Sequence, residues 1–410
     1  MKAISEKRRA YLLIALCWLV YASSYIGKLS YNANIVRIGP TFGVTKDECG
    51  MVSSFFFFAY GIGQIANGLL CKRYNIKYVI FGALTVSGVM NLLVAIAENF
   101  AYIKFFWLIN GIAMSFLWTS LIRLLSENLS GEYMNKAILA MGTTVATGTF
   151  IVYGLSALFS LVASFRLTFI VAASVLVAVA LVWFFAFNAL SGGVQKSAEK
   201  ECAQTLVIPQ KSRGKTVLPF LCVLAFFAVA NNFIKDGLTA WTPDILKSIY
   251  ETPDWLSILL TLLLPTLAIM GAVVSVKLVH LTKDFVVSAT VLFAVSTVLI
   301  GAVLALTSTA SVLALSVAIF GIISCLMTGV NNIITSMVPL SLKSEGNSGK
   351  VAGILNGFCY LGSTLSSYGL GLIAEKFDWL AVFLTLIGIS VFVVVIGVSF
   401  VIVKKAKKRL

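Results

Sequence analysis

The chain has 410 residues, of which 59% are hydrophobic and 11% are charged, and its mean hydropathy is +0.98. A soluble domain cannot hide that much apolar surface, since charged residues usually make up about a quarter of a soluble chain. The net charge of +15 does not point to nucleic acid, because the basic residues stand in short gaps between apolar runs and at both ends. The composition therefore predicts a polytopic membrane protein without a nucleic-acid partner.

Apolar stretches long enough to span the hydrocarbon layer as helices of roughly 20 residues follow one another along the chain. One extended polar segment, 190–215, interrupts them. We expect an all-α polytopic membrane protein with 12 transmembrane helices in two pseudo-symmetric six-helix bundles, residues 1–189 and 216–410, joined by a cytoplasmic linker at 190–215. The predicted spans are 10–36, 49–71, 78–97, 104–124, 136–162, 167–189, 216–244, 256–278, 285–306, 310–338, 350–373 and 379–403.

The distribution of Lys and Arg predicts the topology, because cytoplasmic loops are enriched in positive residues. With the N-terminus inside, 23 of these residues fall on the cytoplasmic side and 6 on the outer side. We therefore expect both termini in the cytoplasm. We also expect a monomer in the lipid bilayer of the cell (inner) membrane. Two lysines, Lys28 and Lys235, remain in the middle of predicted spans.

The two halves resemble each other, as in transporters built from repeats. Lys28 lies 18 residues beyond the start of the first span, and Lys235 lies 19 beyond the start of the seventh. The tripeptide Tyr153-Gly154-Leu155 recurs as Tyr368-Gly369-Leu370. Matching depth, order and spacing favour a duplicated half.

A lysine in mid-span costs about 2.5–3.5 kcal/mol on insertion scales and usually faces a bundle interior or an aqueous cavity. The alternative is that each lysine reaches the interface or pairs with a structural acid. Asp236 could neutralise Lys235, although neighbouring helix positions point about 100° apart. Two ammonium groups that face one cavity repel each other unless a negative charge lies between them, so the pair indicates a small anionic substrate.

Polar side chains surround both lysines at helical spacing. Interhelical hydrogen bonding would explain any one of them, but two such faces at corresponding depth favour a shared cavity. The candidate substrate-binding residues from these faces are Lys28, Tyr25, Tyr31, Asn32, Lys235, Asn231, Asn232 and Thr239.

Intramembrane acids and histidines, which proton-driven transporters use as relays, are scarce. Only Asp236 lies clearly within a span, and the single histidine, His280, lies in a short cytoplasmic loop. Exchange of one anion for another needs no relay, so exchange is favoured over proton coupling. The seven cysteines form no CxxC pair, and no catalytic or metal-ligand motif is present, so we expect no cofactor, metal site or enzyme activity.

Three motifs carry a family resemblance. The loop Gly68–Lys77 is similar to G-x-x-x-D-R-x-G-R-R, with Lys72 in place of the Asp. Helix seven, over Asn232–Pro243, ends in Trp241-Thr-Pro, and helix eleven reads A-G-x-x-x-G-x-x-x-Y-L-G up to Gly362. Over residues 10–403 the chain resembles the organophosphate:inorganic phosphate antiporters of the major facilitator superfamily.

The resemblance implies a secondary transporter that works by alternating access, and it puts Lys28 and Lys235 at the positions of the family's paired phosphate-binding arginines. Lysine keeps the preference for anions but loosens the geometric preference for phosphate. Carboxylate exchange or symport, and a non-transporting sensor on the same fold, stay open as alternatives. The motifs add Tyr360 to the substrate-binding set, and Arg73, Arg123, Asp236 and Trp241 as gating or structural residues; Arg123 could also merely anchor its helix.

Overall fold

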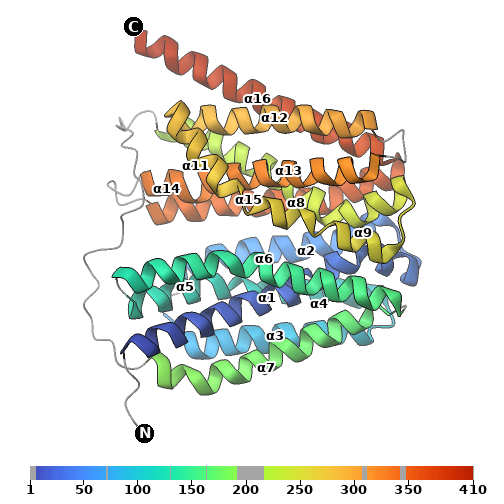
Figure 1. Ribbon diagram of the computed structural model, residues 1–410, viewed down its shortest axis with the longest axis vertical. Coiled ribbons are helices and arrows are strands. Elements are labelled where there is room, and N and C mark those ends of the chain that lie inside the picture. Colours follow the sequence, from blue (N-terminus) through green and yellow to red (C-terminus); the bar gives the residue numbers. More distant parts are fainter. Residues whose placement is uncertain are drawn as a thin grey trace. The chain divides into compact units, whose positions relative to one another are not determined.

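The computed structural model describes residues 6–70, 73–129, 131–162, 164–191, 217–306, 312–341 and 348–409. In this part of the chain the regular structure is entirely helical (Figure 1), which confirms the predicted all-α class. The helices are α1 (Glu6–Phe42), α2 (Lys46–Leu70), α3 (Ile76–Ile96), α4 (Phe100–Ser115), α5 (Leu117–Asn128), α6 (Gly131–Leu161), α7 (Arg166–Ser191), α8 (Val217–Tyr250), α9 (Asp254–Leu260), α10 (Leu263–Ala268), α11 (Gly271–Thr282), α12 (Phe285–Leu306), α13 (Leu313–Asn332), the π-helical turn η3 (Ile333–Met337), α14 (Val338–Ser341), α15 (Ser348–Lys376) and α16 (Trp379–Arg409).

Eleven helical segments among the described residues are long and apolar enough to cross a membrane. The remaining predicted span, 350–373, corresponds to α15, a helix of 29 residues. Its glycines and the hydroxyls of Ser363, Thr364, Ser366 and Ser367 lower its mean hydropathy, although its length suffices for a span.

Three of the predicted spans are not single regular helices. Phe116 separates α4 from α5, the span 256–278 consists of α9, α10 and α11, and η3 interrupts the end of the span 310–338. The break before α10 has a local cause, because Pro265 has no amide hydrogen to donate to the carbonyl of Thr261. The amide of Leu264 donates to that carbonyl instead, at 3.1 Å, which tightens the turn.

The helices group into two compact units. The first contains the described residues of 1–34 and 58–205, and the second contains those of 35–57 and 206–410. Helices α1 and α2 therefore each contribute residues to both units. The division into bundles at 1–189 and 216–410 stays a prediction, and most of the expected linker, 192–215, lies outside the described residues.

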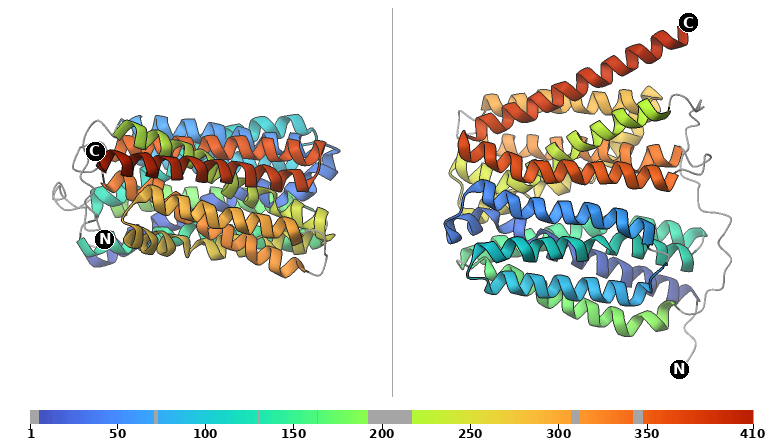
Figure 2. Two further views of the ribbon diagram at one scale, coloured as in Figure 1. Left: turned by 90° about the horizontal axis from the view of Figure 1, so that it is seen from above. Right: turned by 180° about the vertical axis from the view of Figure 1, so that it is seen from behind.

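Packing within each unit relies on close helix approaches. In the first unit, α3 runs beside α7 and α4, and the indole of Trp183 on α7 donates to the carbonyl of Lys77 on α3 at 3.0 Å (Figure 1). In the second unit, α8 packs mainly against α15, and α12 lies beside α16 and α13 (Figure 2). Helix α8 of this pair carries Lys235 and Asp236, whose side chains are about four-fifths buried.

Candidate functional site

The ammonium group of Lys28 lies among aromatic rings in the first unit. Its Nζ is 4.1 Å from the ring centroid of Tyr60 on α2 and 5.2 Å from that of Tyr25 on α1. Tyr21 packs edge-on against Tyr25, and its ring centroid is 4.7 Å from that of Trp118 on α5. Aromatic faces stabilise a nearby cation by about 0.5–2 kcal/mol, so the rings hold the lysine head at a partly buried position.

A buried amide network fixes the helix turn that carries Lys28. The carbonyl of Gly27 accepts hydrogen bonds from the side chains of Asn91 on α3 and Asn110 on α4, both at 3.2 Å. Ser30 donates to Asn91 at 2.7 Å, and Ser87 donates to Asn110 at 2.6 Å. Because all of these side chains are fully buried, the network sets the rotation of α1 about its axis and hence the direction of Lys28.

The ammonium group of Lys235 in the second unit has an acidic partner. Its Nζ is 3.3 Å from Oδ1 of Asp236, and the two side chains keep 22% and 20% of their surface exposed. This contact differs from the sequence-based expectation that neighbouring helix positions point about 100° apart. The four-methylene stem of lysine is long enough to bend back along the helix, and this closes the gap.

Asp236 is tied to α15 as well as to its own helix. Its Oδ2 accepts from Oγ of Ser363 at 2.5 Å and from Nδ2 of Asn232 at 3.0 Å. Asn232 in turn accepts from Asn231 at 3.0 Å. The carboxylate therefore joins α8 to α15 through buried donors.

The same backbone approach recurs in both units. A Cβ at Gly148 of α6 would collide with the carbonyl of Ala22, and a Cβ at Gly362 of α15 would collide with that of Val229. Each carbonyl lies six residues before the unit's interior lysine. The two lysines thus occupy equivalent places in the internal repeat.

The other predicted substrate-binding residues have varied surroundings. Tyr31 is fully buried, with its ring centroid 5.5 Å from that of Trp107, and Asn32 is 93% buried. The hydroxyl of Thr239 donates to the carbonyl of Lys235 at 2.8 Å, and Tyr360 is partly exposed on α15. These positions leave the substrate-binding role of each residue a prediction.

The predicted gating residues also differ from one another. Arg73 is exposed after α2, and Nε of Arg123 lies 2.7 Å from a carboxylate oxygen of Glu127 on the same helix. Trp241 is buried, and its indole donates to the carbonyl of Ser367 at 3.2 Å. Trp241 therefore supports the α8–α15 packing.

Tyr60, Asn91 and Asn110 surround Lys28 or the turn that carries it and are not among the sequence-predicted site residues. They stand on α2, α3 and α4, so no spacing along α1 could link them to Lys28. Polar residues deep within otherwise apolar spans are the signal that could have identified the two asparagines.

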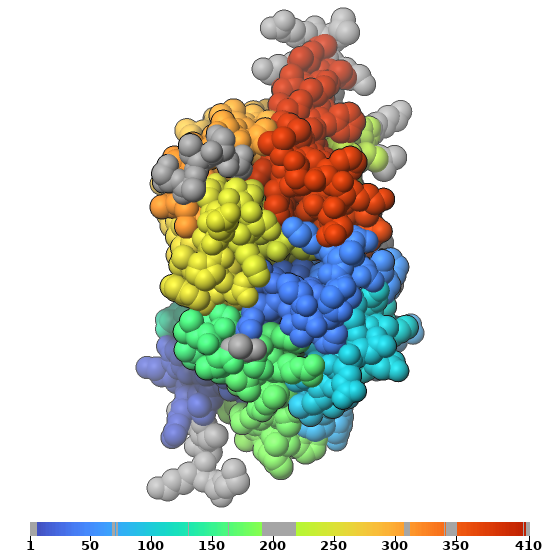
Figure 3. Space-filling view, turned by 90° about the vertical axis from the view of Figure 1, so that its right-hand side faces the viewer, coloured from blue at the N-terminus to red at the C-terminus, as the bar shows by residue number. Residues whose placement is uncertain are grey.

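Ion pairs join residues 35–57 to the rest of the second unit, at the end where α1 leads into α2. Arg37 lies 3.7 Å from Asp254, which also pairs with Lys247 at 2.8 Å. Lys46 lies 3.1 Å from Asp244. In Figure 3 the blue surface of this part of the chain adjoins the yellow surface around the start of α9. These ion pairs attach the 35–57 segment to α8 and α9.

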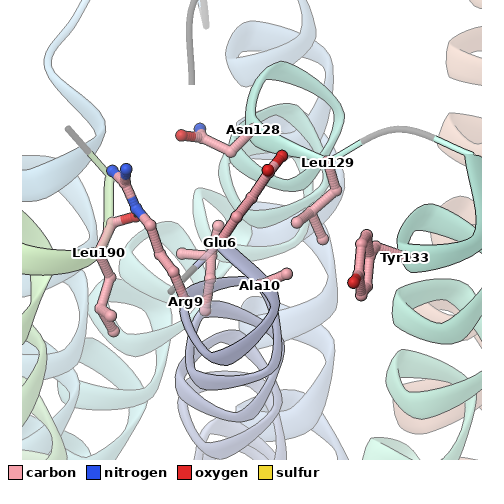
Figure 4. Close-up of a pocket in the computed structure, with 8 residues that line it drawn as sticks. Glu6, Arg9, Ala10, Asn128, Leu129, Tyr133 and Leu190 are labelled. Carbon is pink, nitrogen blue, oxygen red and sulfur yellow. The ribbon is translucent and has the colours of Figure 1, made fainter. Parts of the chain in front are cut away.

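A small pocket of about 30 Å³ lies at the start of α1 in the first unit, away from the predicted site residues. Arg9 donates from Nε to the carbonyl of Leu190 at 2.8 Å, while Glu6 extends toward Asn128 and Leu129 (Figure 4). Among the described residues, no group of three His, Cys, Asp or Glu side chains could hold a metal ion.

Comparisons with known proteins agree with this architecture. The family model described as Major Facilitator Superfamily matches residues 17–340. A bacterial homologue of the human lysosomal transporter Spinster, in an inward-facing and occupied conformation, has a TM-score of 0.71 at 14% identity, covering 97% of each chain. The nucleoside transporter NupG also gives 0.71 at 14% identity, covering 95% of this chain and 99% of the other. These likenesses show the fold.

Similarity to curated relatives is partial. The membrane sensor protein UhpC of Salmonella typhimurium is 27% identical over 108 residues, which are 26% of this chain and 24% of the relative. The 3-(3-hydroxy-phenyl)propionate transporter of Escherichia coli is 26% identical over 137 residues, covering 33% of this chain and 34% of the relative. The "Probable hexose phosphate transport protein" of Chlamydia trachomatis is 24% identical over 110 residues, covering 27% and 24%. The chain thus matches about a quarter to a third of these relatives' lengths.

Proposed function

Since the chain belongs to the Major Facilitator Superfamily, we propose that it is a secondary transporter that moves a small organic anion by alternating access. The observation that carries the proposal is the equivalence of Lys28 and Lys235, each six residues beyond a backbone approach that recurs in the repeat. A positive charge kept inside a membrane protein is costly, so two at equivalent places favour a shared functional role. We assign both lysines to binding the charge of the transported anion.

The remaining site residues take supporting roles in this proposal. Tyr25 and Asn232 act beside the lysines, as do the other polar residues of the two faces, Tyr31, Asn32, Asn231, Thr239 and Tyr360. Arg73, Arg123, Asp236 and Trp241 act as gating or structural residues. Asp236 and Trp241 contact α15 through Ser363 and Ser367, and Arg123 pairs with Glu127 on its own helix.

Two further features of the proposal concern coupling and location. We propose exchange of one anion for another, because Asp236 is the one carboxylate that the sequence puts clearly within a span. The named substrates of two relatives, hexose phosphate and 3-(3-hydroxy-phenyl)propionate, are both organic anions.

We further propose that the protein is a monomer in the cell (inner) membrane with both termini in the cytoplasm.

Binding to purified protein tests the proposal directly. A panel of inorganic phosphate, sugar phosphates, glycerol phosphate, monocarboxylates and dicarboxylates should contain members that stabilise the protein against heat, since a ligand at about 100 times its dissociation constant adds roughly 2.7 kcal/mol. Lys28→Ala and Lys235→Ala should each weaken binding of such an anion roughly ten- to hundredfold, as expected for charge-assisted contacts. Lys277→Ala, which removes an exposed lysine of α11, is the matched control and should bind normally. Normal binding by both interior variants would overturn the proposal.

The second candidate function is a sensor, which the similarity to UhpC favours. A sensor would bind the anion without moving it. Proteoliposomes loaded with unlabelled anion distinguish the two: a transporter exchanges external labelled anion for it, whereas a sensor leaves the label outside although the purified protein binds it.

A further inference from the structure

The acid beside Lys235 bears on how tightly this lysine holds an anion. Nζ of Lys235 lies 3.3 Å from Oδ1 of Asp236, and about a fifth of each side chain is exposed. Both residues stand on α8, within the second unit. The head of the lysine is therefore accessible, but it already has a counter-ion from its own helix.

The carboxylate of Asp236 is held in place by other side chains. Ser363 on α15 donates to Oδ2 at 2.5 Å, and Asn232, one turn earlier on α8, donates to the same oxygen at 3.0 Å. Both donors are buried, and moving the carboxylate away would break both hydrogen bonds. Lys235 is the mobile partner of the pair, because a flexible four-carbon stem carries its ammonium group. An anion can therefore draw the ammonium group away while Asp236 stays in position.

An anion that binds Lys235 has to compete with Asp236 for the same ammonium group. If Nζ turns fully to the anion, its contact with Oδ1 is lost. If Nζ donates to both, as its three hydrogens permit, the anion lies close to a second negative charge. In either arrangement the anion binds more weakly than it would to the same lysine without the acid.

The pair also matters when the anion has left. The ammonium group can then return to Oδ1, so Lys235 does not stay in the interior without a counter-ion. An isolated ammonium group is costly wherever water is excluded, and this cost would oppose the rearrangement of an empty transporter. Asp236 lowers that cost.

We propose that Asp236 is a built-in competitor for Lys235: it weakens the binding of the transported anion and serves as the counter-ion of the lysine in the empty protein. The empty protein then returns without a bound anion, so slow release of anion without exchange accompanies exchange. This proposal rests on the proposed function, because it requires Lys235 to bind the transported anion.

The substitution Asp236→Asn removes the competing charge and keeps the size of the side chain. The probes are inorganic phosphate, glycerol phosphate, benzoate and succinate. Each probe that binds the purified wild-type chain should bind this variant about three- to tenfold more tightly. Asp284→Asn is the matched control, since Asp284 stands directly before α12 and pairs with Lys404. This control should bind the probes as the wild-type chain does.

A change at Ser363 should act in the opposite direction. Ser363→Ala removes a donor to Oδ2, so the carboxylate depends more on Lys235, and we expect the same probes to bind about two- to fivefold more weakly. In the Asp236→Asn background the same change should have little effect, because the competing charge is already absent. Equal losses in the two backgrounds would overturn the competition.

Efflux from proteoliposomes measures the return of the empty protein. Vesicles loaded with a labelled probe are diluted into medium with or without the unlabelled probe. Asp236→Asn should retain exchange, but its release into probe-free medium, relative to exchange, should fall about fivefold or more. Asp284→Asn should keep the wild-type ratio. A merely structural role of Asp236 would not tighten binding while lowering this ratio.

The outcomes separate the two proposals. If no anion binds the wild-type chain, the proposed function fails. If anions bind the wild-type chain but bind Asp236→Asn no more tightly, the competition by Asp236 is wrong while the transport proposal stands. The same conclusion follows if the wild-type protein exchanges a probe but releases none of it into probe-free medium.

Discussion

The surroundings of Lys28 and Lys235 differ although the two lysines occupy equivalent places in the repeat. Rings of Tyr60 and Tyr25 face the first lysine, whereas the carboxylate of Asp236 lies beside the second. An aromatic face stabilises an ammonium group through the quadrupole of the ring, whereas a carboxylate stabilises it by direct pairing of opposite charges. The duplicated scaffold thus keeps the position of each charge, while the side chains that stabilise it differ between the units.

Alanine substitutions at the two close helix approaches should destabilise the two units by similar amounts. Gly148→Ala and Gly362→Ala each push a Cβ into a backbone carbonyl of the neighbouring helix, and overpacking of this kind costs about 1–3 kcal/mol or more. We expect a clear fall in the thermal unfolding temperature of both variants.

Matched controls exist at Gly154 and Gly369, where a Cβ meets open space. Alanine there should be neutral or mildly stabilising, because glycine in a helix is less favourable than alanine by about 1 kcal/mol. A large loss in one unit and none in the other would contradict the structural equivalence of the repeats.

Because Asp236 lies beside Lys235, removal of the lysine should lower the stability of the protein, and a second substitution at Asp236 should restore it. Lys235→Ala leaves the Asp236 carboxylate partly buried without its cation, and we expect a loss of about 1–3 kcal/mol after allowing for its exposed fifth. The double variant Lys235→Ala/Asp236→Asn should regain most of that stability. Thermal unfolding in detergent measures both, and a double variant less stable than the single one would refute the pairing.

Removal of an aromatic ring near Lys28 should have a smaller effect, which we expect in anion affinity. Tyr60→Leu removes a ring centred 4.1 Å from the ammonium group, so we expect anion affinity to fall by a few-fold, in line with about 0.5–2 kcal/mol for a cation–π contact. Tyr60→Phe keeps the ring and should retain most of the affinity in the same binding assay. Equal losses in the two variants would mean that the hydroxyl, which accepts from Gln64 at 2.9 Å, matters instead of the ring.

The sequence predicts the helices better than their interruptions. The span 285–306 coincides with α12, because long apolar runs between polar residues determine where a membrane helix begins and ends. At the break near Phe116, the side chain of Asn67 on α2 donates to the carbonyls of Ser115 and Phe116, and no local pattern encodes such a contact between helices.

In the candidate site too, the sequence predicts some features, and others depend on contacts formed in the folded chain. Both interior lysines stand out in the sequence because a charge within an apolar span is rare. The contact of Tyr60 with Lys28 joins two helices, and the closure of Lys235 onto Asp236 depends on a side-chain rotamer. Distances of these kinds arise only when the chain is folded.

The modest hydropathy of α15 has a consequence for how the protein is made. The transfer of this helix on its own from water into the bilayer is only weakly favourable, because it contains many hydroxyl groups and glycines. It is not one of the eleven strongly apolar spans. Helix α8 precedes it in synthesis and offers Asp236 as the acceptor for Ser363. Efficient insertion of α15 into the bilayer should therefore depend on α8 being present first, so that the polar face of the later helix enters the membrane already matched to a partner.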